Sequence, residues 1–588
     1  GISLTEGLGA GENPSVGEEA AFESEAEIRN ILKNNTKMVF VTAGMGGGTG
    51  TGAAPVIAQI CKDLDILTIG IVTVPFGFEG PKRFKQAQEG IDKMRKYVDS
   101  LVVINNDKLV EVYGDLGLRS GFAKADETLM VAARGIAEVI TKNCLVNIDL
   151  NDDEKLNFFS GNKVPDTSIP IALNYSGHQF GNFVHELGDG RAVLLGEVRN
   201  KDNRYDVQLK GSGQTKFSRQ GDGRSALGPV IREYILSEAM HHLGVPTSRA
   251  LAAITTGEFV ARETFEPGGI LTRVAKSHLR VGTFEYFASR QQWDDLKILA
   301  DYAIQRHFPE VRETGNHYLE LLKRVSINQS ILISRWMSIG FVHGVMNTDN
   351  FTISGETIDY GPCAFLDEYH PGKVFSSIDQ SGRYAFGNQP SIASWNLASL
   401  AGCLIAFIDK DSDKANKLAT EVLENFSIET NQRILDLMCE KIGLDGSNKK
   451  NQSLLKKLLK IMMDNQSDYT LTFRNISDLL RGNFDKFYEQ FNNRKEIDSW
   501  LVDWKAQLKE ENEDIATLAE NLDEINPAFI PRNHLIQEVI DEAYDNNFSK
   551  FSEMIKIVES PFKENSKTAP YSKAPLEEQK INKTYCGT

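Results

Sequence analysis

Hydrophobic and polar positions follow two different patterns along the chain, and the change falls near residue 154. Before it, apolar runs such as KMVFVTAG, LTIGIVTVP and LVVINN are separated by amphipathic stretches such as EGIDKMRKYVDSLV. Apolar runs of strand length that alternate with helical stretches predict a parallel sheet with helices packed on it. The sequence therefore predicts an α/β layer over residues 1–153.

Beyond this point the pattern is that of a mixed domain followed by a helical one. The mixed part contains the strand-like runs RAVLLGEV and RYDVQLKG and the helical stretch VIREYILSEAMHHLG. From Trp395 onward nearly every stretch has helical periodicity, as in NQSLLKKLLKIMMDN. The polar, proline-containing end of the chain is typical of an extended tail. We expect an α+β domain over 154–588, with a small lobe at about 156–290, a helical lobe at about 291–560 and a tail at about 561–588.

The composition is that of a folded protein with more than one domain. The chain has 588 residues, of which 41% are hydrophobic and 25% charged. Its net charge of -16 argues against a general nucleic-acid binder. No apolar run approaches the roughly eighteen residues that span a bilayer, and no signal-peptide pattern occurs at the N-terminus, so we expect no membrane partner. Six cysteines without a CxxC pair favour a reducing cytoplasm over a disulfide framework or a zinc site.

A glycine-rich run, Gly46–Gly52, follows the first predicted strand and precedes a helical stretch. Glycines allow backbone amides to close around a phosphate, and a helix N-terminus adds a favourable dipole. The run is not a Walker loop, because no Lys-Ser/Thr pair follows it. Taken alone, it is better explained as a turn without a ligand.

The run belongs to an ordered set of motifs, GLGAGENPSVG, GGGTGTGAAP, PFGFEGPKR, INNDKL, GFAKADETL and NIDLND. This set resembles FtsZ, the tubulin-like GTPase of the bacterial division ring, over residues 1 to about 153. The resemblance implies a partial Rossmann-type layer that binds GTP through Gly48, Thr49 and Gly50 at the phosphates, Glu79 and Arg83 at the ribose, and Asp126 at the guanine. The opening strand and the C-terminal domain of that family have no counterpart in the matched segment, so we expect neither tight GTP binding nor self-association into filaments.

A second candidate site combines four residue types in the order of a kinase active centre. Lys210 ends a strand-like run, and Glu233 lies in the helical stretch that follows, as do the lysine and glutamate of a kinase small lobe. In HGVMNTDNFTISGETIDYGP, Asn350 and Asp359 supply oxygen ligands suited to Mg²⁺, and Asp349 is a candidate proton acceptor. Each residue alone fits an ordinary ion pair or turn, whereas all of them in this order favour an ATP site.

Glycine turns and arginines extend this set. The turns hold Gly188, Gly190 and Arg191 in HELGDGRAVLLGE, and Asp222 and Gly223 in SRQGDGRSALG. Arg273 and Arg280 in LTRVAKSHLR would share one face of two helical turns if that stretch is helical. Each arginine alone is explained equally well by a surface ion pair. Together they exceed what a kinase that transfers a γ-phosphate usually needs.

Long motifs carry a second resemblance, to the selenoprotein O (YdiU) family, over about residues 156–588. They are SGHQFG, LGDGRAVLLGE, DVQLKGSGQTKFSRQGDGRSALGPVIREYILSEAMHHLGVPTSRAL, HGVMNTDN, TIDYGP, GRYAFGNQPSIASWNL and NPAFIPRNH. The resemblance implies a protein-kinase-like (pseudokinase) fold that binds ATP in a flipped orientation. It implies transfer of AMP to Ser, Thr or Tyr hydroxyls of proteins with release of pyrophosphate, and, for some members, use of UTP with Mn²⁺.

Carried onto this sequence, the resemblance assigns a role to each residue of the candidate site. ATP would be bound by Gly188, Gly190, Arg191, Lys210, Asp222, Gly223, Arg273, Arg280 and Asp359. Glu233 would hold Lys210, Asp349 would accept the proton, and Asn350 with Asp359 would bind Mg²⁺ or Mn²⁺. Cys586 would be the redox residue of the tail, and Phe375 stands where some relatives carry its partner cysteine.

We therefore expect a cytoplasmic bacterial protein adenylyltransferase that uses ATP and modifies protein substrates, placed behind a partial FtsZ-like segment. The alternative is an FtsZ-type GTP-binding cell-division fragment to which the kinase-like part is fused as cargo. A third interpretation is a catalytically silent scaffold. GTP-dependent polymerisation separates the second interpretation from the first.

Overall fold

The structure is a computed structural model that describes residues 2–5, 9–33, 36–108, 125, 130, 152–165, 167–200, 203–511, 514–565 and 568–584. The chain forms two compact units, Gly1–Asn147 and Ile148–Thr588, and each is described by itself.

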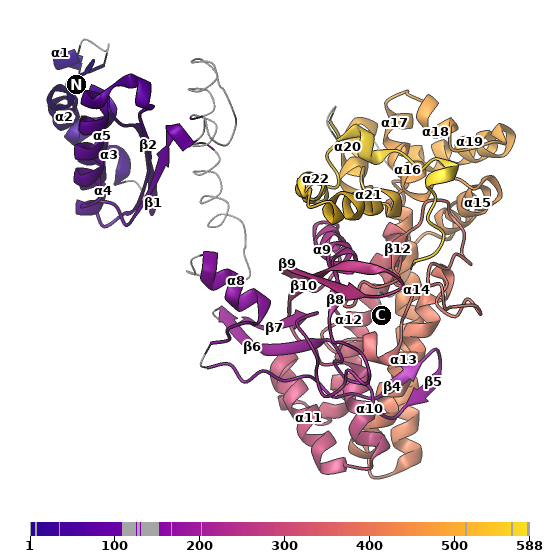
Figure 1. Ribbon diagram of the computed structural model, residues 1–588. Coiled ribbons are helices and arrows are strands. Elements are labelled where there is room, and N and C mark those ends of the chain that lie inside the picture. Colours follow the sequence, from indigo (N-terminus) through magenta and orange to yellow (C-terminus); the bar gives the residue numbers. More distant parts are fainter. Residues whose placement is uncertain are drawn as a thin grey trace. The chain divides into compact units, whose positions relative to one another are not determined.

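The first unit is built on a parallel sheet of three strands in the order β1 (Met38–Gly44), β2 (Leu67–Val74) and β3 (Ser100–Asn105). These strands are the three apolar runs of the sequence, so that prediction is confirmed. Helices α4 (Gly48–Asp63) and α5 (Pro81–Met94) alternate with the strands (Figure 1). The amphipathic stretch EGIDKMRKYVDSLV is not one helix, because α5 ends at Met94 and the last three residues of the stretch begin β3.

The core of this unit lies between the sheet and its helices. Val41 and Val72 of the sheet pack with Ala58 of α4 and Ile91 of α5, and all four are buried. Helix α2 (Pro14–Glu23) packs against α4, where the glycines of α4 allow a close approach. The remaining elements are α1 (Ile2–Thr5), α3 (Glu25–Leu32) and η1 (Gly77–Glu79).

The second unit contains an antiparallel sheet of five strands. Strand β7 (Asn203–Lys210) lies between β6 (Ala192–Asn200) and β10 (Phe265–Ala275). Strand β10 also pairs with β9 (Arg249–Ala261) and with the short β8 (Ser225–Ala226). The predicted strands RAVLLGEV and RYDVQLKG are therefore confirmed as the β6–β7 hairpin.

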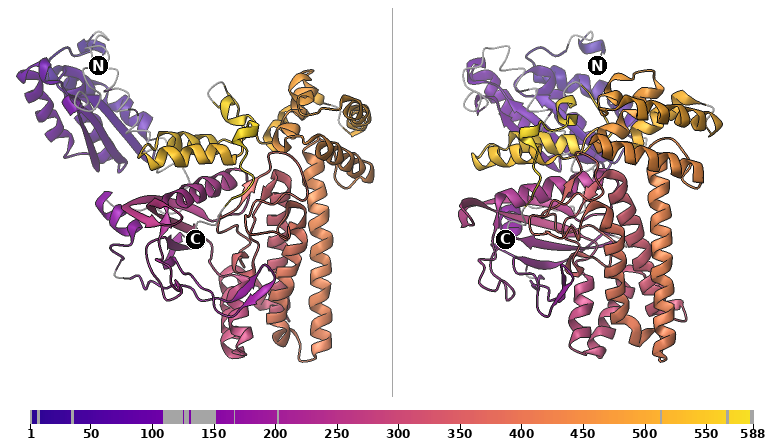
Figure 2. Two further views of the ribbon diagram at one scale, coloured as in Figure 1. Left: turned by 45° about the vertical axis from the view of Figure 1, so that its right-hand side comes forward. Right: turned by 90° about the vertical axis from the view of Figure 1, so that its right-hand side faces the viewer.

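Helix α9 (Leu227–His242) connects the sheet to the rest of the unit. One side of α9 packs on β9 and β10, and the other packs on α21 (Asn533–Tyr544) and α22 (Ser549–Val558), which Figure 2 draws in yellow near α9. Because both sides are covered, buried residues occur around most of the helix rather than along one stripe.

The helical part of the unit is centred on three long helices, α12 (His317–Ile339), α13 (Gln389–Ile408) and α14 (Ser412–Glu440), which pack against one another. A single large core connects α9 to these helices and includes Leu236, Phe284, Leu322 and Leu397. The other helices are α8 (Asp152–Ser160), α10 (Val281–Ser289), α11 (Trp293–His307), α15 (Lys449–Asn465), α16 (Tyr469–Arg474), α17 (Ile476–Leu480), α18 (Asp485–Tyr488), α19 (Arg494–Glu511), α20 (Ile515–Ile525) and α23 (Ala569–Ser572).

Short elements shape the loops near the centre of the unit. They are the hairpin β4 (Gly177–Gln179) and β5 (Asn182–Val184), the pair β11 (Phe341–Val342) and β12 (Ala364–Phe365), and the turns η2 (Pro309–Glu313), η3 (Thr348–Asn350), η4 (Phe386–Asn388) and η5 (Glu577–Gln579). The tail is less extended than predicted, since it contains α23 and η5.

One segment departs from the sequence-based observation that no apolar run approaches the length of a bilayer span, while the expectation of no membrane partner stays a prediction. Among the described residues, the segment Phe386–Ile408, which contains α13, is long and apolar enough to cross a bilayer by length and composition. Half of its most apolar stretch is buried inside the unit, where α13 packs against α10, α12 and α14. The core helix of a folded domain has the same composition, because it too is surrounded by apolar side chains.

Candidate functional site

A cleft of about 750 Å³ opens in the second unit beside the β6–β7 hairpin. Its walls come from the turn before β6, the end of β7, the loop over residues 217–224, the β9–β10 hairpin and the segment that carries Asp349. The cleft is lined by the residues that the sequence assigned to nucleotide, metal and proton-acceptor roles, namely Gly188, Gly190, Arg191, Lys210, Asp222, Gly223, Arg273, Arg280, Asp349, Asn350 and Asp359.

Lys210 and Glu233 form the ion pair that their order in the sequence predicted. Lys210 ends β7 and Glu233 lies in α9, and the Lys210 Nζ to Glu233 Oε2 distance is 2.7 Å. Lys210 Nζ is also 3.1 Å from Asp359 Oδ1. Because Glu233 is buried against the sheet, its carboxylate holds the lysine at the floor of the cleft.

Arg273 and Arg280 both bind the carboxylate of Asp359, but they come from elements that the sequence did not predict. The stretch LTRVAKSHLR is not a helix: Arg273 lies in β10, which stays paired with β7 through Ala275, and Arg280 directly precedes α10. Arg273 nevertheless donates to Asp359 Oδ1, and Arg280 Nη1 donates to Asp359 Oδ2 at 3.0 Å. The condition of a helical stretch is therefore not met, while both arginines still lie together in the cleft.

Asp359 is thus a carboxylate surrounded by three cations. Burial opposes its charged form, but Arg273, Lys210 and Arg280 outweigh this effect and hold the pKa of Asp359 well below its ordinary value. Its backbone has a φ of 60°, in the left-handed region that residues other than glycine rarely adopt. Such backbone conformations cluster at functional sites.

Asp349 has the opposite electrostatic character. Burial raises its pKa to about 6, although the charge of Arg280 opposes the shift. Its Oδ2 accepts a long hydrogen bond of 3.4 Å from Gln179 Nε2, and its Oδ1 has no donor within the described part of the chain. A buried carboxylate with an oxygen still available is suited to accept a proton from an incoming hydroxyl.

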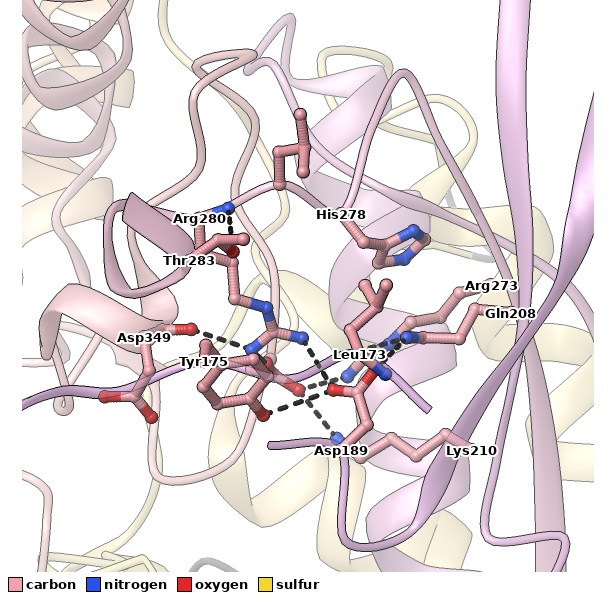
Figure 3. A network of polar contacts seen from close by, with 12 residues as sticks. Leu173, Tyr175, Asp189, Gln208, Lys210, Arg273, His278, Arg280, Thr283 and Asp349 are labelled. Atoms are coloured by element: carbon pink, nitrogen blue, oxygen red, sulfur yellow. Dashed lines mark hydrogen bonds and ion pairs between the residues drawn. The ribbon is translucent and has the colours of Figure 1, made fainter. Parts of the chain in front are cut away.

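Sequence reasoning missed Asp189, which lies between the two glycines of the first turn. As Figure 3 shows, its carboxylate meets Tyr175 and Arg280; Oδ1 is 3.2 Å from the Tyr175 hydroxyl and 3.4 Å from Arg280 Nη2. Oδ2 accepts from Gln208 Nε2 at 2.9 Å. Burial raises the pKa of Asp189, and Arg280 opposes this. An aspartate between glycines is an ordinary turn residue, so the sequence carried no signal for this role.

Both glycine turns are packed too closely to admit a side chain. A Cβ at Gly188 would lie 2.5 Å from the Phe217 ring, and one at Gly223 would lie 2.2 Å from the carbonyl oxygen of Gly213. Thr215 Oγ1 donates to the carbonyl oxygen of Asp189 at 2.6 Å, which ties the second turn to the first. Both glycines also have positive φ, so the turns require glycine at these positions.

The charges of the cleft favour a polyanion. Among the described lining residues, the cations are Arg191, Lys210, Arg219, Arg224, Arg262, Arg273 and Arg280, and the anions are Asp189, Asp222, Asp349 and Asp359. Asp222 is paired with Arg262 at 2.9 Å, so this pair adds little net charge. The excess of guanidinium and ammonium groups fits several phosphate groups in the same cleft.

The donors present fit a hard divalent cation bound together with phosphate. Within the described residues, no group of three or more His, Cys, Asp or Glu side chains is arranged to hold a metal ion. Asp359 and Asn350, which both line the cleft, offer carboxylate and amide oxygens. Mg²⁺ commonly takes one or two such ligands and completes its shell with phosphate oxygens and water.

The motif NPAFIPRNH, to which the sequence assigned no role, holds the segment after Asp359. Arg232, next to Glu233 on α9, donates to the carbonyl oxygens of Gly361 (3.3 Å) and Cys363. The same guanidinium donates to Asn533 Oδ1 at 2.7 Å. The Asp-Tyr-Gly loop is therefore fixed from α9 and α21 together.

The tail also reaches this segment. The Thr584 backbone amide donates to the Phe375 carbonyl oxygen at 2.8 Å, and Thr584 Oγ1 donates to the Pro362 carbonyl oxygen at 2.6 Å. Phe375, the residue where relatives carry a cysteine, is buried at this contact. Cys586 lies outside the described residues.

In the first unit, polar groups of the candidate phosphate loop form hydrogen bonds within the chain. The amide of Gly46 donates to Thr51 Oγ1 at 2.8 Å, and that of Gly48 donates to the Gly11 carbonyl oxygen at 2.7 Å. Thr49 Oγ1 accepts from the Ala10 amide. These groups lie at and just before the start of α4, the position of Gly48, Thr49 and Gly50. Each already has a hydrogen-bond partner within the chain.

The other GTP candidates are engaged in the same way. Glu79 and Arg83 pair with each other at 2.9 Å, and Arg83 also pairs with Glu12 at 3.0 Å. Asp126 lies outside the described residues.

Comparisons with known proteins match the two units to two families. The family model for protein adenylyltransferase SelO matches residues 126–559, and the model for the Tubulin/FtsZ family GTPase domain matches residues 1–114. A protein nucleotidyltransferase YdiU from Maridesulfovibrio salexigens is 52% identical over 439 residues, which is 74% of this chain and 89% of the relative. Another from Agrobacterium fabrum is 50% identical over 75% of this chain and 91% of the relative. Among solved structures, an empty FtsZ dimer from M. jannaschii is 48% identical, with a TM-score of 0.25, over 26% of this chain and 45% of that chain.

Proposed function

The chain belongs to the protein adenylyltransferase SelO family and is therefore a nucleotidyltransferase, and we propose that its second unit transfers AMP from ATP to hydroxyl groups of protein substrates. The observation that carries this proposal is the convergence of Lys210, Arg273 and Arg280 on Asp359 in a cleft that also holds the buried Asp349. This arrangement supports binding of a triphosphate next to a proton acceptor.

The number of cations favours adenylyl transfer over phosphoryl transfer. When the α-phosphate is attacked, the β- and γ-phosphates leave together as pyrophosphate, and the charge that develops on them needs neutralisation. Lys210, Arg273 and Arg280 supply charge at the floor of the cleft, and Arg191 lies in the glycine turn above β6. Guanidinium groups bind phosphate oxygens through two parallel hydrogen bonds, so they suit this leaving group.

The proposed reaction needs one proton acceptor. The hydroxyl oxygen of the acceptor residue attacks the α-phosphorus, the bond from that phosphorus to the bridging oxygen breaks, and pyrophosphate leaves with the electron pair. The hydroxyl proton passes to Asp349. With a pKa of about 6, Asp349 is ionised at neutral pH but more basic than an exposed carboxylate.

We assign the divalent cation, Mg²⁺ or Mn²⁺, to Asn350 and Asp359. A bound cation would supply positive charge to the phosphate oxygens. Asp359 is kept ionised by its three cationic neighbours, which suits it to this role. Three features support a protein-kinase-like arrangement for this unit. They are the Lys210–Glu233 pair, the five-stranded sheet with α9, and the helical part with the Asp349 and Asp359 segments.

Intact-mass spectrometry tests the proposal. The full chain is incubated with a generic acceptor protein and either ATP with Mg²⁺ or UTP with Mn²⁺, and Asp359→Ala is run in parallel. We expect an AMP-sized increase on the chain or the acceptor that is absent in the variant. A phosphate-sized increase would identify a kinase instead, and a UMP-sized increase only with UTP would change the assigned donor.

A further inference from the structure

The β4–β5 hairpin contacts the segment that carries Asp349 over its whole first strand. The His178 amide donates to Thr348 Oγ1 at 2.7 Å, and the Phe180 amide donates to Asn347 Oδ1 at 3.1 Å. The hairpin and the Asp349 segment lie so close that a Cβ at Gly177 would be 2.9 Å from Thr348 Oγ1 and 3.2 Å from Asp349 Oδ1. The position of Asp349 therefore depends on this hairpin.

Glu285 of α10 joins these two segments. Its Oε1 is 2.6 Å from His178 Nδ1, and its Oε2 accepts a hydrogen bond of 2.5 Å from Thr348 Oγ1. The side chain is 5% exposed, and each carboxylate oxygen has its own partner. A buried carboxylate is stable only when its oxygens are satisfied in this way, so the three residues act as one unit.

Aromatic packing restricts the imidazole of His178 as well. Its ring meets Trp395 of α13 edge-to-face at 4.9 Å and lies 5.0 Å from the ring of Phe183 in β5. With the ring fixed, Nδ1 stays directed at Glu285, and the backbone of β4 stays against Thr348. The network thus connects α10, α13 and β4 to the residue directly before Asp349.

The carboxylate of Asp349 has few contacts of its own that would fix it. Its Oδ2 has only the long contact with Gln179 among the described hydrogen bonds, and its carbonyl oxygen accepts from Arg280 Nη1 at 2.7 Å. The described residues that line the cleft include Gln179 but not Glu285, His178 or Thr348. The Glu285 network is therefore behind the carboxylate and outside the space for the nucleotide.

We propose that Glu285 is a positioning residue for the reaction: by holding Thr348 and His178, it fixes Asp349 and Gln179 in place for the acceptor hydroxyl. The inference rests on the proposed function and adds the residue that orients its proton acceptor. It predicts that loss of the network slows transfer of AMP without weakening ATP binding. A misplacement of about 1 Å in a reacting group can lower a rate about 100-fold.

Two substitutions and a conservative control test the proposal in the full chain. Glu285→Gln leaves too few acceptors for both partners, and Thr348→Val removes the hydroxyl while keeping the side-chain shape. Thr348→Ser restores the hydroxyl at the same position. Glu238→Gln changes another buried glutamate. Glu238 pairs with Arg249 at a distance of 2.6 Å, and neither residue lines the cleft. The measurements are kcat and KM for AMP transfer, the Kd of ATP, and the unfolding temperature.

We expect kcat to fall about 10- to 100-fold in Glu285→Gln and Thr348→Val, with the Kd of ATP changed by less than about 3-fold. Thr348→Ser and Glu238→Gln should keep kcat within about 3-fold of the wild type.

Equal rates for Thr348→Val and Thr348→Ser would overturn the inference, because the hydroxyl contact would then have no role. A loss of ATP binding in step with kcat would also overturn it, since the network would then support the whole cleft. If the wild type transfers no AMP while it binds ATP, the proposed function itself fails, and the inference fails with it.

Discussion

Two aspartates in one short segment show how burial and neighbouring charge separate the chemistry of identical side chains. Asp349 and Asp359 are both in the cleft, yet the pKa of Asp349 is raised to about 6 and that of Asp359 is lowered well below its usual range. Asp359 touches three cations, whereas the effect of burial on Asp349 is opposed mainly by the charge of Arg280. Titratable groups whose pKa values are pushed apart in this way are suited to different roles.

The first prediction concerns the pH dependence of AMP transfer. The raised pKa of Asp349 means that its basic form is lost as the pH falls through about 6, so kcat should decline about tenfold per pH unit below that value. A pH–rate profile between pH 5 and 8 measures this. Asp349→Asn should lose most of the activity across the range while still binding ATP, and a profile without an acid limb near pH 6 would contradict the assigned base.

The second prediction concerns stability, at a buried carboxyl outside the cleft. Burial raises the pKa of Glu356 to about 7, against the opposing charge of Lys276. The unfolded chain releases this proton near pH 4.5, before the folded chain does, so the free energy of unfolding should fall between pH 4.5 and 7. Glu356→Gln should therefore gain on the order of 2 kcal/mol relative to the wild type between pH 5 and pH 8.

Urea unfolding at both pH values measures this change. Glu421→Gln, on the exposed side of α14, is the control and should show the same difference from the wild type at both. If the Glu356→Gln difference is equally independent of pH, the carboxyl of Glu356 is not the group that titrates.

At the scale of elements, the turns around the cleft are held by glycine. Gly223 has a φ of 67°, and a Cβ there would meet the Gly213 carbonyl oxygen at 2.2 Å. Gly257 lies within β9, where the pairing with β10 shifts register; it has a similar φ of 72° but nothing within 4 Å of a Cβ. Substitutions at these two glycines therefore separate backbone strain from steric clash.

The third prediction follows from this pair. Both Gly223→Ala and Gly257→Ala should lower stability by about 1 kcal/mol through strain at positive φ, and Gly223→Ala should lower it further because its Cβ would also clash with the Gly213 backbone. Only Gly223→Ala should also weaken ATP binding, by about tenfold or more, because the clash with Gly213 must displace the loop that lines the cleft. Calorimetric titration with ATP measures the difference, and equal ATP affinities would show that the loop does not contact the nucleotide.

At the scale of the whole molecule, the chain consists of two units with separate cores and separate candidate nucleotide sites. In the first unit, the amides of Gly46 and Gly48 already have acceptors within the chain. In the second, the cleft presents an excess of cations. We therefore expect ATP, rather than GTP, to be the nucleotide that stabilises this protein.

The fourth prediction uses the distribution of tryptophan. All five tryptophans lie in the second unit, so tryptophan fluorescence follows its unfolding, while scanning calorimetry follows both units. ATP with Mg²⁺ at about 100 times its Kd should stabilise the fluorescent unit by about 2.7 kcal/mol. GTP should leave the other transition within about 1 °C of its position. A GTP-dependent shift of the non-fluorescent transition would favour the alternative, a GTP-binding first unit.

Local pattern and composition determined much of this protein. The three strands of the first unit, strands β6 and β7, and α9 could all be predicted, because each is an apolar run of strand length or a longer helical stretch in the sequence. The Lys210–Glu233 pair could be predicted as well, since a lysine at the end of a strand followed by a glutamate in a helix is the arrangement of a kinase small lobe.

Only the tertiary structure decided which distant residues share one environment. Arg273 lies in a strand and Arg280 before a helix, and they meet at Asp359 because β10 pairs with β7 and α10 packs beside the Asp349 segment. Asp189 and Glu285 were not predicted, since each binds partners far away in the sequence and looks ordinary among its neighbours. Periodicity records whether a residue is buried, whereas the charges that surround it depend on how separate segments pack, and those charges set the chemistry of this cleft.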